Sequence, residues 1–436
     1  MNSKLVYVGM TAEFFHHGHA NILIKAREYG NVMVGLLTDS ALLSHKRLPM
    51  LTWEQRKTII ANFNGVTEVV PQHEWEYSNN ILKYRPDFMV HGDDWNVEHQ
   101  KNVKDKALAA LKTYGGRLIE IAYTDGVSSS VLQKEELSNG ILPSTRVGIL
   151  RRLINAKSIV RVLESHNAVT ASIVDQSEHF SNSMNEVVRF DAIWSSSLTD
   201  STSRGLPDTE ALSISSRLLN IMEIFNVTNL PLIMDADTGG DAQHLSLHIK
   251  SMERIGISAC IIEDKKGLKK NSLLGTSVSQ EIEEPLVFAE KIDVAIKSKI
   301  SQDFMVIARL ESLILELGME DALNRARLYC EAGVDGIMIH SRKKSPSEIF
   351  QFASIFRKEF PDVPLISVPT TYNEVYEKEL VDAGFNVVIY ANHMLRAAVP
   401  AMRNVANTIL ENGRSFEVDS RIESMASILK FIPGTV

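Results

Sequence analysis

The sequence predicts an α/β protein with two domains, a doubly wound parallel sheet followed by a (β/α)8 barrel. Short apolar runs alternate with helical patterns over the first 140 or so residues, as in a doubly wound sheet. Eight further apolar runs, mostly separated by helix-length segments, follow over about 220 residues, close to the length of a (β/α)8 barrel. We place the boundary just before Pro143, which gives domains 1–142 and 143–436.

The composition is that of an ordinary soluble protein. The 436 residues include 46 Lys+Arg and 54 Asp+Glu, a net charge of −8, and 44% are hydrophobic. This excludes a disordered or collagen-like chain, and neither half is basic enough to suggest nucleic-acid binding. There is no run of about 18 apolar residues and no signal-peptide pattern, and the two cysteines, Cys260 and Cys330, lack metal-site spacing. We expect a cytoplasmic enzyme without a membrane or nucleic-acid partner.

The N-terminal domain is expected to alternate strand and helix. The predicted strands are Leu5–Val8, Val32–Leu37, Val66–Val70, Phe88–Val90 and Leu118–Ile121. The predicted helices lie near His19–Tyr29, Thr52–Asn62 and Val97–Thr113. In such a sheet ligands bind beyond the carboxyl ends of the strands.

The C-terminal domain is expected to begin with an amphipathic helix, Ser144–Ser165, followed by the barrel. The eight predicted strands are Val169–Val174, Ala192–Trp194, Leu230–Met234, Ser258–Ile262, Phe304–Ala308, Gly336–Ile339, Leu365–Val368 and Val387–Tyr390. Most of them run directly into residues capable of chemistry, which are Trp194, Ser195, Ser196, Asp235, Asp237, Glu263, Asp264, Lys265, Arg309, Glu311, His340, Ser341, Thr370, Asn392 and His393. This placement predicts an active site at the barrel mouth.

A magnesium site is expected among the carboxylates at this mouth. Asp235 and Asp237 are two residues apart on an extended segment, so their side chains leave the same face. With Glu263 they form an all-oxygen cluster of the kind that suits Mg²⁺. The alternative is a pair of helix-capping aspartates.

Cationic residues at the same mouth predict an anionic substrate. The segment Glu263–Gly275 is rich in Lys and Gly and reads as a mobile loop over the site, although it is also compatible with a solvated charge run. Arg309 offers a fork for a carboxylate or phosphoryl group, whereas His340 alone would more often be a structural histidine.

The segments WSSSL, MDADTGG, EDKKGLKKNSL, ARLES and IMIHSRK, in this order, resemble phosphoenolpyruvate mutases of the isocitrate lyase superfamily over residues 145–430. Lyases of that superfamily carry a catalytic cysteine on the mobile loop, where this chain has Asn271. The resemblance therefore implies isomerisation of phosphoenolpyruvate to phosphonopyruvate, with Mg²⁺. Phosphonopyruvate hydrolase is the alternative, but Lys269, Asn271 and Ser272 favour the mutase, as does the attached domain.

The resemblance also implies roles for individual residues. It implies that Asp237 ligates Mg²⁺ directly, that Asp235 and Glu263 do so through waters, and that Ser196 and the backbone of Ser197 and Leu198 bind the pyruvate carboxylate. The residues expected to contact the phosphoryl group are Arg309, Ser272, Asn271 and His340. Asp208 is expected at the site entrance, Lys269 in the closed state of the loop, and Trp194 and Glu311 in further substrate contacts. Ser197 stands where the family is expected to have glycine.

An HxGH element follows the first predicted strand. His16 and His19 share one face at the start of the first helix, where both imidazoles and the helix N-terminus favour a phosphate. Two surface histidines without function are the alternative. The element resembles the HxGH nucleotidyltransferases, in particular the cytidylyltransferases, and LTWEQRKTII, HGDDW and YTDGVSSSVL resemble further motifs of that family.

This second resemblance implies attack of an anionic acceptor on the α-phosphate of CTP, with His16 and His19 stabilising the transition state. The nucleotide-binding residues that it implies are Gly9, Met10, Thr11, Gly18, Lys46, Arg56, Gly92, Asp93, Tyr123, Ser128, Ser129 and Ser130. Tyr123 replaces an arginine of the family and MTAE replaces its GTFD; Lys46 is a candidate to supply the missing charge.

The combined architecture resembles the bifunctional enzymes of fosfomycin biosynthesis, in which such a domain cytidylylates 2-hydroxyethylphosphonate. The acceptor stays open between that compound and 2-aminoethylphosphonate. A regulatory nucleotide-binding domain that does not turn CTP over is a further alternative. The family resemblance also implies barrels that exchange their last helices, hence a homodimer or homotetramer.

Overall fold

The computed structural model describes residues 4–93, 95, 98–122, 140–181, 185–267 and 269–432. The chain forms two compact units, and each is described here by itself. The first unit consists of residues 1–139 together with Glu178–Val188, and the second consists of residues 140–177 and 189–436. The sequence-based boundary at residue 142 did not anticipate that a short internal segment belongs with the first unit.

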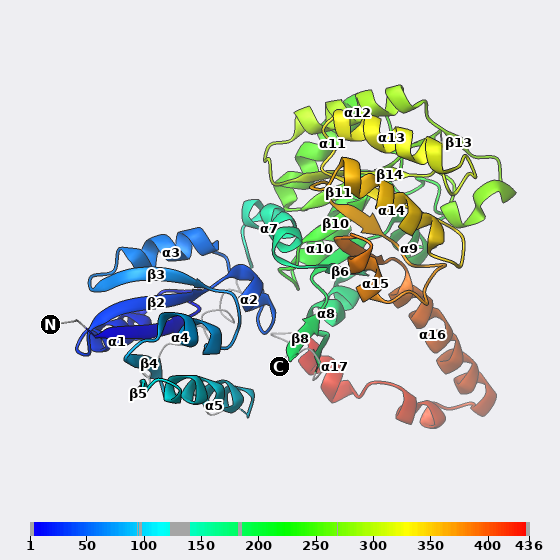
Figure 1. Ribbon diagram of the computed structural model, residues 1–436. Helices are drawn as coiled ribbons and strands as arrows, with labels where there is room; N and C mark the ends of the chain where they lie inside the picture. The colour runs from blue at the N-terminus through cyan, green and yellow to red at the C-terminus, as the bar shows by residue number, and fades with distance from the viewer. Residues whose placement is uncertain are drawn as a thin grey trace. The chain divides into compact units, whose positions relative to one another are not determined.

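The first unit is built on a five-stranded parallel sheet with the order β3-β2-β1-β4-β5 (Figure 1). Its strands are β1 (Leu5–Met10), β2 (Asn31–Leu37), β3 (Val66–Gln72), β4 (Phe88–Gly92) and β5 (Arg117–Ile121). All five expected strands are present, each within two residues of its predicted bounds. The central strand is β1, so the residues that follow it lie at the middle of the sheet edge.

Helices cover both faces of this sheet. They are α1 (His17–Ala26), α2 (Asp39–Leu43), α3 (Trp53–Ala61), α4 (Ser78–Tyr84) and α5 (Glu98–Lys112). Val6 and Val8 of β1 pack into one apolar core with α1, while Tyr7 between them packs into a second core with α4 and α5. The sheet is therefore doubly wound, as predicted, although the short helices α2 and α4 were not anticipated.

The second unit contains a closed eight-stranded parallel barrel with the order β10-β11-β14-β15-β16-β17-β6-β9 (Figure 1). The strands are β6 (Val160–Glu164), β9 (Ala192–Ser195), β10 (Leu232–Asp235), β11 (Ala259–Glu263), β14 (Met305–Leu310), β15 (Gly336–Ile339), β16 (Leu365–Ser367) and β17 (Val387–Tyr390). The predicted barrel is confirmed, and seven of the eight predicted strands are present.

The first barrel strand was predicted at the wrong place. Residues Val169–Val174 form part of helix α8 (Ala168–Gln176), and the strand is β6, which we predicted as the end of a long helix. Helix α7 ends at Ala156, and Asn167 caps α8 by accepting the N–H of Thr170 at 2.9 Å. A short segment of mainly apolar and β-branched residues is compatible with a strand or a helix, and the asparagine cap favours the helix.

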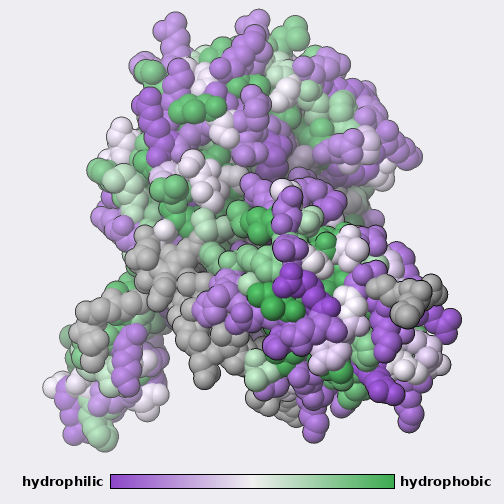
Figure 2. Space-filling model, turned by 90° about the vertical axis from the view of Figure 1, so that its left-hand side faces the viewer, coloured by the Kyte–Doolittle hydropathy of each residue, from purple (hydrophilic) through white to green (hydrophobic). Residues whose placement is uncertain are grey.

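Further helices surround the barrel or follow it. They are α7 (Pro143–Ala156), α9 (Ser197–Ser203), α10 (Ile214–Phe225), α11 (Ala242–Ile255), α12 (Pro285–Ser298), α13 (Met319–Glu331), α14 (Ser347–Glu359), α15 (Glu377–Asp382), α16 (His393–Asn412) and α17 (Met425–Phe431), with short 3₁₀ helices at Ser272–Ser277 and Phe416–Arg421. Hydrophilic and hydrophobic residues are interspersed over much of the face shown in Figure 2. No helix in the described part of the chain is long and apolar enough to cross a membrane.

Two short antiparallel pairs lie outside the main sheets. Strands β7 (Glu178–Ser181) and β8 (Glu186–Arg189) pair with each other, and Val187 N donates to Ser44 O of the first unit at 2.8 Å. Strands β12 (Lys265–Lys266) and β13 (Glu281–Ile282) pair at the base of the expected loop over the barrel mouth. We call residues 267–280, between these two strands, the flap.

Candidate active sites

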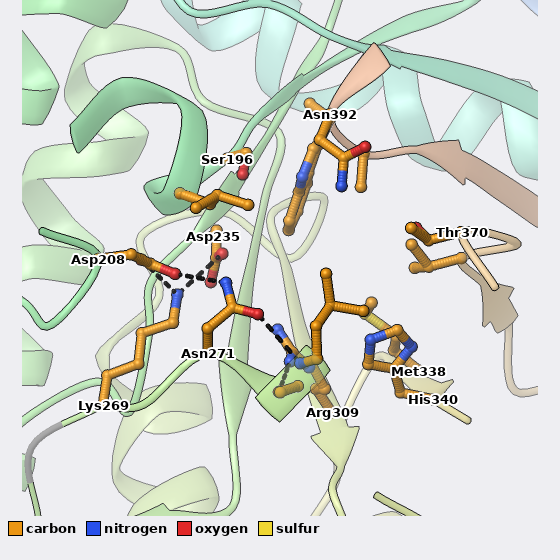
Figure 3. Close-up of a pocket in the computed structure, with 16 residues that line it drawn as sticks. Ser196, Asp208, Asp235, Lys269, Asn271, Arg309, Met338, His340, Thr370 and Asn392 are labelled. Atoms are coloured by element: carbon orange, nitrogen blue, oxygen red, sulfur yellow. Dashed lines mark hydrogen bonds and ion pairs between the residues drawn. The ribbon is translucent and has the colours of Figure 1, made fainter. Parts of the chain in front are cut away.

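A pocket lies at the carboxyl ends of the barrel strands, where the sequence predicts the active site (Figure 3). The residues that line it are Trp194, Ser196, Leu198, Asp208, Asp235, Lys269, Asn271, Ser272, Leu273, Arg309, Met338, His340, Val368, Thr370, Ala391 and Asn392. Ten of the residues singled out for substrate, metal or catalysis are in this set. Ser197, Asp237, Glu263 and Glu311 are buried and bonded to residues that line the pocket.

Asp235 and Asp237 meet at a turn and not on an extended strand. Strand β10 ends at Asp235, and Asp237 has a left-handed backbone with φ of 55°, which is uncommon for a residue other than glycine. The N–H of Asp237 donates to Asp235 Oδ1 at 3.1 Å. Ser197, expected to bind the substrate carboxylate through its backbone, here donates its N–H and hydroxyl to Asp235 Oδ2, at 3.4 and 2.8 Å.

The ammonium of Lys269 lies among three carboxylates. Its Nζ is 2.5 Å from Asp237 Oδ1, 3.3 Å from Asp208 Oδ1 and 3.4 Å from Asp235 Oδ2, and it also contacts the hydroxyl of Ser197. Burial disfavours the charge, but the attraction of Asp235 and Asp237 outweighs it and raises the pKa of Lys269. The flap is therefore held against the barrel by a charged contact, as expected for a closed loop.

Glu263 is a buried carboxylate with weak partners. Neither oxygen accepts a hydrogen bond from the described residues, and its ion pairs with Arg309 and Lys265 span 3.3 and 3.8 Å. Burial raises the pKa of Glu263 to about 7, against the opposing effect of Arg309.

The described residues place no three His, Cys, Asp or Glu side chains ready around a metal ion. The donor set nevertheless fits a hard cation. The oxygens of Asp235, Asp237 and Glu263 are of the kind that Mg²⁺ prefers, and those of Glu263 lack hydrogen-bond donors. Lys269 now supplies the positive charge next to the two aspartates, so an ion ligated by Asp237 requires this ammonium to move.

Arg309, Ser272 and Glu311 form a buried network beneath the pocket. Arg309 Nε donates to Glu311 Oε1 at 2.5 Å, and the hydroxyl of Ser272, which Arg309 also contacts, lies 2.7 Å from Glu311 Oε2. Although burial alone would raise it, the Arg309 charge lowers the pKa of Glu311 to about 2. Glu311 thus orients two groups that line the pocket, and its direct contact with substrate stays a prediction.

His340 and Asn271 face the same pocket as neutral polar groups (Figure 3). Burial, reinforced by the Arg309 charge, lowers the pKa of His340 to about 4, so its imidazole is neutral at pH 7. Asn271 Nδ2 donates to Asp208 Oδ2 at 2.9 Å, and its Oδ1 accepts the N–H of Leu273 at 3.0 Å. The amide therefore has a fixed orientation with its oxygen and nitrogen distinguished.

The HxGH histidines begin helix α1 in the first unit. His16 Nδ1 accepts the N–H of Gly18 at 3.1 Å, His19 Nδ1 accepts the N–H of His16 at 3.4 Å, and their ring centroids are 4.2 Å apart. Burial lowers the pKa of both imidazoles, that of His19 to about 4. With Nδ1 accepting, each neutral ring carries its proton on Nε2, which gives two neighbouring donors.

Two cations predicted for the nucleotide have protein partners here. Lys46 Nζ donates to Glu13 Oε2 at 2.7 Å. Arg56 is buried and donates to Thr11 O at 2.5 Å and to Asp39 Oδ1 at 2.7 Å, so it fixes the loop that carries Thr11.

Of the remaining residues predicted to bind the nucleotide, some lie in the described part of the chain and the others do not. Gly9 has a packing reason of its own, because a Cβ there would lie 2.1 Å from the Tyr77 ring. Met10, Gly18 and Gly92 are buried beside the strand ends and Asp93 is exposed. Tyr123, Ser128, Ser129 and Ser130 lie outside the described residues.

Comparison with known proteins agrees with this geometry. Residues 150–410 match the family described as phosphoenolpyruvate phosphomutase, and residues 7–135 match the cytidylyltransferase-like family. The chain belongs to the phosphoenolpyruvate phosphomutase family. It is an enzyme in which a cytidylyltransferase-like domain precedes the phosphomutase barrel.

The relatives of this phosphomutase-family chain include a phosphonopyruvate hydrolase and phosphoenolpyruvate phosphomutases. It is 35% identical to phosphonopyruvate hydrolase of Variovorax sp. (strain Pal2) over 289 residues, 66% of this chain and 94% of the relative. It is 33% identical to phosphoenolpyruvate phosphomutase of Tetrahymena pyriformis over 284 residues, 64% of this chain and 89% of the relative. The crystal structure of phosphoenolpyruvate phosphomutase from Streptomyces platensis subsp. rosaceus matches with a TM-score of 0.60 and 32% identity, covering 66% of this chain and 94% of that one.

A phosphonopyruvate hydrolase structure in complex with oxalate and Mg²⁺ also matches, with a TM-score of 0.57 and 33% identity, covering 67% of this chain and 95% of that chain. Both kinds of relative share the barrel, so the choice between mutase and hydrolase depends on individual side chains of the site.

Sequence reasoning missed Arg217 in this phosphomutase-family site. Arg217, on α10, is 0% exposed and lies directly behind the two aspartates, donating to the carbonyls of Asp235 and Ser195 and pairing with Asp237 Oδ2 at 3.4 Å. It follows Ile214 by three residues and precedes Ile221 by four, so an arginine on the apolar stripe of this helix was the available signal.

Proposed function

We propose that the barrel domain interconverts phosphoenolpyruvate and phosphonopyruvate. The observation that supports this most directly is the position of Asn271. Its amide lines the pocket and donates to Asp208, and Lys269 of the same flap also pairs with Asp208. A neutral amide can accompany a migrating phosphoryl group but has no acidic proton to give to the enolate. The closed flap also limits access of water to the pocket.

In the proposed reaction the P–O bond of phosphoenolpyruvate breaks, a P–C bond forms at C3, and the enol becomes a ketone. Phosphoryl transfer of this loose kind depends on positioning and charge stabilisation. Arg309 supplies the positive charge, and neutral His340 and Asn271 supply polar contacts in the same pocket. Ser196 lines the opposite part of the pocket (Figure 3), and we assign the pyruvate carboxylate to its hydroxyl.

Magnesium is part of this proposal. Asp235, Asp237 and Glu263 would hold the ion through oxygen, with Arg217 fixing the orientation of Asp237 from behind. When bound, Mg²⁺ supplies positive charge for the developing enolate oxygen.

Phosphorus NMR of the full chain with phosphonopyruvate and Mg²⁺ tests the proposal. Phosphoenolpyruvate as the product supports the mutase. A resonance of inorganic phosphate instead, with pyruvate as the other product, identifies a hydrolase, the second candidate, which the 35% identity to the Variovorax enzyme favours. Asn271→Ala is expected to lose mutase turnover, and Leu274→Ala, which removes an exposed flap side chain, is the matched control.

We also propose that the N-terminal domain transfers a cytidylyl group from CTP to a phosphonate, either 2-hydroxyethylphosphonate or 2-aminoethylphosphonate. The adjacent Nε2 donors inferred for His16 and His19 support this, because a phosphate that gains charge in the transition state needs donors at the strand-end edge of the sheet. New coupled P–O–P resonances after addition of CTP, Mg²⁺ and one phosphonate would establish the activity and its acceptor. Binding of CTP without turnover would indicate a regulatory domain instead.

The proposed enzyme is a cytoplasmic homodimer or homotetramer. The 20-residue helix α16 buries none of its side chains, and the apolar side chains of Met402, Leu410 and Phe416 are 61–81% exposed on it and just after it. Light scattering during size-exclusion chromatography measures the oligomeric state directly, and a monomer at micromolar concentration would contradict this part of the proposal.

A further inference from the structure

Lys265 is a buried cation that the proposed reaction does not use. It is 3% exposed and lies on β12, two residues before the flap begins. Buried lysines are rare unless they are paired, and this ammonium makes two hydrogen bonds and a close ion pair. Nζ lies 2.8 Å from Lys270 O, 2.7 Å from Ser272 Oγ and 3.2 Å from Glu311 Oε2.

These three contacts connect the flap to the barrel. Lys270 and Ser272 flank Asn271 in the flap, whereas Glu311 follows β14 in the barrel. The base of the flap is closed by pairing of Lys265 with Ile282, so one residue closes the base and also reaches the interior of the flap. Lys265 therefore determines where the backbone on both sides of Asn271 lies relative to Glu311.

Lys265 and Lys269 make separate contacts. Lys269 crosses the pocket to Asp208 and Asp237, and that contact fastens the flap on the far side. Lys265 acts on the opposite side of the flap from that contact, next to Arg309. The ammonium of Lys265 and the guanidinium of Arg309 both contact Ser272 and Glu311. The neighbouring Lys266 is exposed on the same short strand.

We propose that Lys265 is a positioning residue that holds the amide of Asn271 at the phosphoryl path and so favours return of the phosphoryl group to substrate over its capture by water. This inference rests on the proposed mutase function. Without Lys265 the flap loses this anchor, and water reaches phosphorus more often. Water then forms the new P–O bond as the P–C bond breaks, C3 takes a proton, and phosphonopyruvate yields pyruvate and inorganic phosphate.

The test compares Lys265→Met with Lys266→Met, its matched control, in the full-length enzyme. Phosphorus NMR with phosphonopyruvate and Mg²⁺ measures both products. Since a misplacement of about 1 Å can cost about 100-fold in rate, we expect Lys265→Met to lower mutase kcat by about that factor with a smaller change in KM. We also expect it to raise the proportion of pyruvate and phosphate. Lys266→Met should match the wild type in rate and product ratio.

A product ratio unchanged in Lys265→Met would overturn the proposal, because a role in fold stability alone lowers the amount of active enzyme without changing what it makes. If Lys265→Met does not fold, Lys265→Gln, which removes the charge but keeps a polar end, is measured in its place against Lys266→Gln.

Limited trypsin digestion without substrate is the second readout. Cleavage after Lys269 and Lys270 should be faster in Lys265→Met than in Lys266→Met, and equal rates would also overturn the proposal. This readout does not depend on turnover. A wild-type enzyme that leaves phosphonopyruvate unchanged would refute the proposed function, while the digestion would still test the anchor.

Discussion

We predict that Arg217→Met destabilises the barrel much more than Arg204→Met does. Both arginines pair with Asp200, but Arg217 is buried and Arg204 is partly exposed. The guanidinium of Arg217 donates to two backbone carbonyls and lies 3.4 Å from Asp237 Oδ2 and 3.6 Å from Asp200 Oδ2, with no exposure to solvent. Methionine fills much of the same volume but offers no charge and no donors. The substitution therefore leaves two buried carboxylates and two carbonyls short of a partner.

The expected loss follows from these contacts. Removing one partner of a buried ion pair costs about 3–5 kcal/mol. Asp237 keeps Lys269, and Asp200 keeps Arg204 at 2.9 Å, so we expect the lower end, about 3 kcal/mol. Arg204→Met is the matched control, because Arg204 is 38% exposed and exposed pairs contribute only about 0–1 kcal/mol.

Urea unfolding of both variants in EDTA measures the difference, and Mg²⁺ titration followed by calorimetry measures the effect on the metal site. Groups that orient metal ligands typically change affinity by about 10–100-fold when removed, so we expect weaker Mg²⁺ binding by Arg217→Met alone. Unfolding free energies of the two variants that agree within about 0.5 kcal/mol would refute the reasoning. They would show that the aspartates do not depend on this arginine.

Three more outcomes are expected. Burial raises the pKa of Glu263 to about 7, so between about pH 4.5 and 7 the folded chain keeps a proton that the unfolded chain has released. The stability of the metal-free protein, measured as the urea midpoint, should therefore fall as pH rises through this range. Glu263→Gln should lose this pH dependence of the urea midpoint. His16→Ala/His19→Ala should lower cytidylyl transfer by about 100-fold or more with mutase turnover intact, and equal loss of both activities would contradict separate sites. Gly9→Ala should lower stability by about 1–3 kcal/mol, as measured by urea unfolding, because the added methyl meets the Tyr77 ring; an unchanged midpoint would show that the ring moves freely.

Most of the fold could be predicted because buried parallel strands are short and apolar on both faces. Strands such as Gly336–Ile339 and Val387–Tyr390 have the predicted bounds. The failure at residues 159–176 has a physical cause. Val160–Glu164 continues the apolar spacing of the preceding helix, and Val169–Val174 has a strand-like composition, so periodicity alone could not separate them. The cap at Asn167 was the local signal that distinguishes the two.

The candidate site could be predicted where a polar residue lies at the carboxyl end of a buried strand, as Asp235 and Arg309 do. Arg217 could not be found in this way, because charged residues are usually solvated and a sequence does not show which of them a fold encloses. Lys265 does follow a predicted strand, but its burial and its contacts with the flap could not be predicted. The structure also gives Arg56 and Lys46 protein partners that sequence reasoning left open for a nucleotide.

The position of β7 and β8 bears on how this enzyme can be taken apart. Residues Glu178–Val188 belong with the first unit although they lie in the chain between α8 and the barrel strand β9. The polypeptide therefore passes from one unit to the other three times, after residues 139, 177 and 188. A single cut near residue 140 would leave each fragment with an error, the first lacking a strand pair and the second carrying one without its partner at Ser44. A barrel fragment for separate study of the proposed phosphomutase activity should therefore carry a short connection in place of Glu178–Val188.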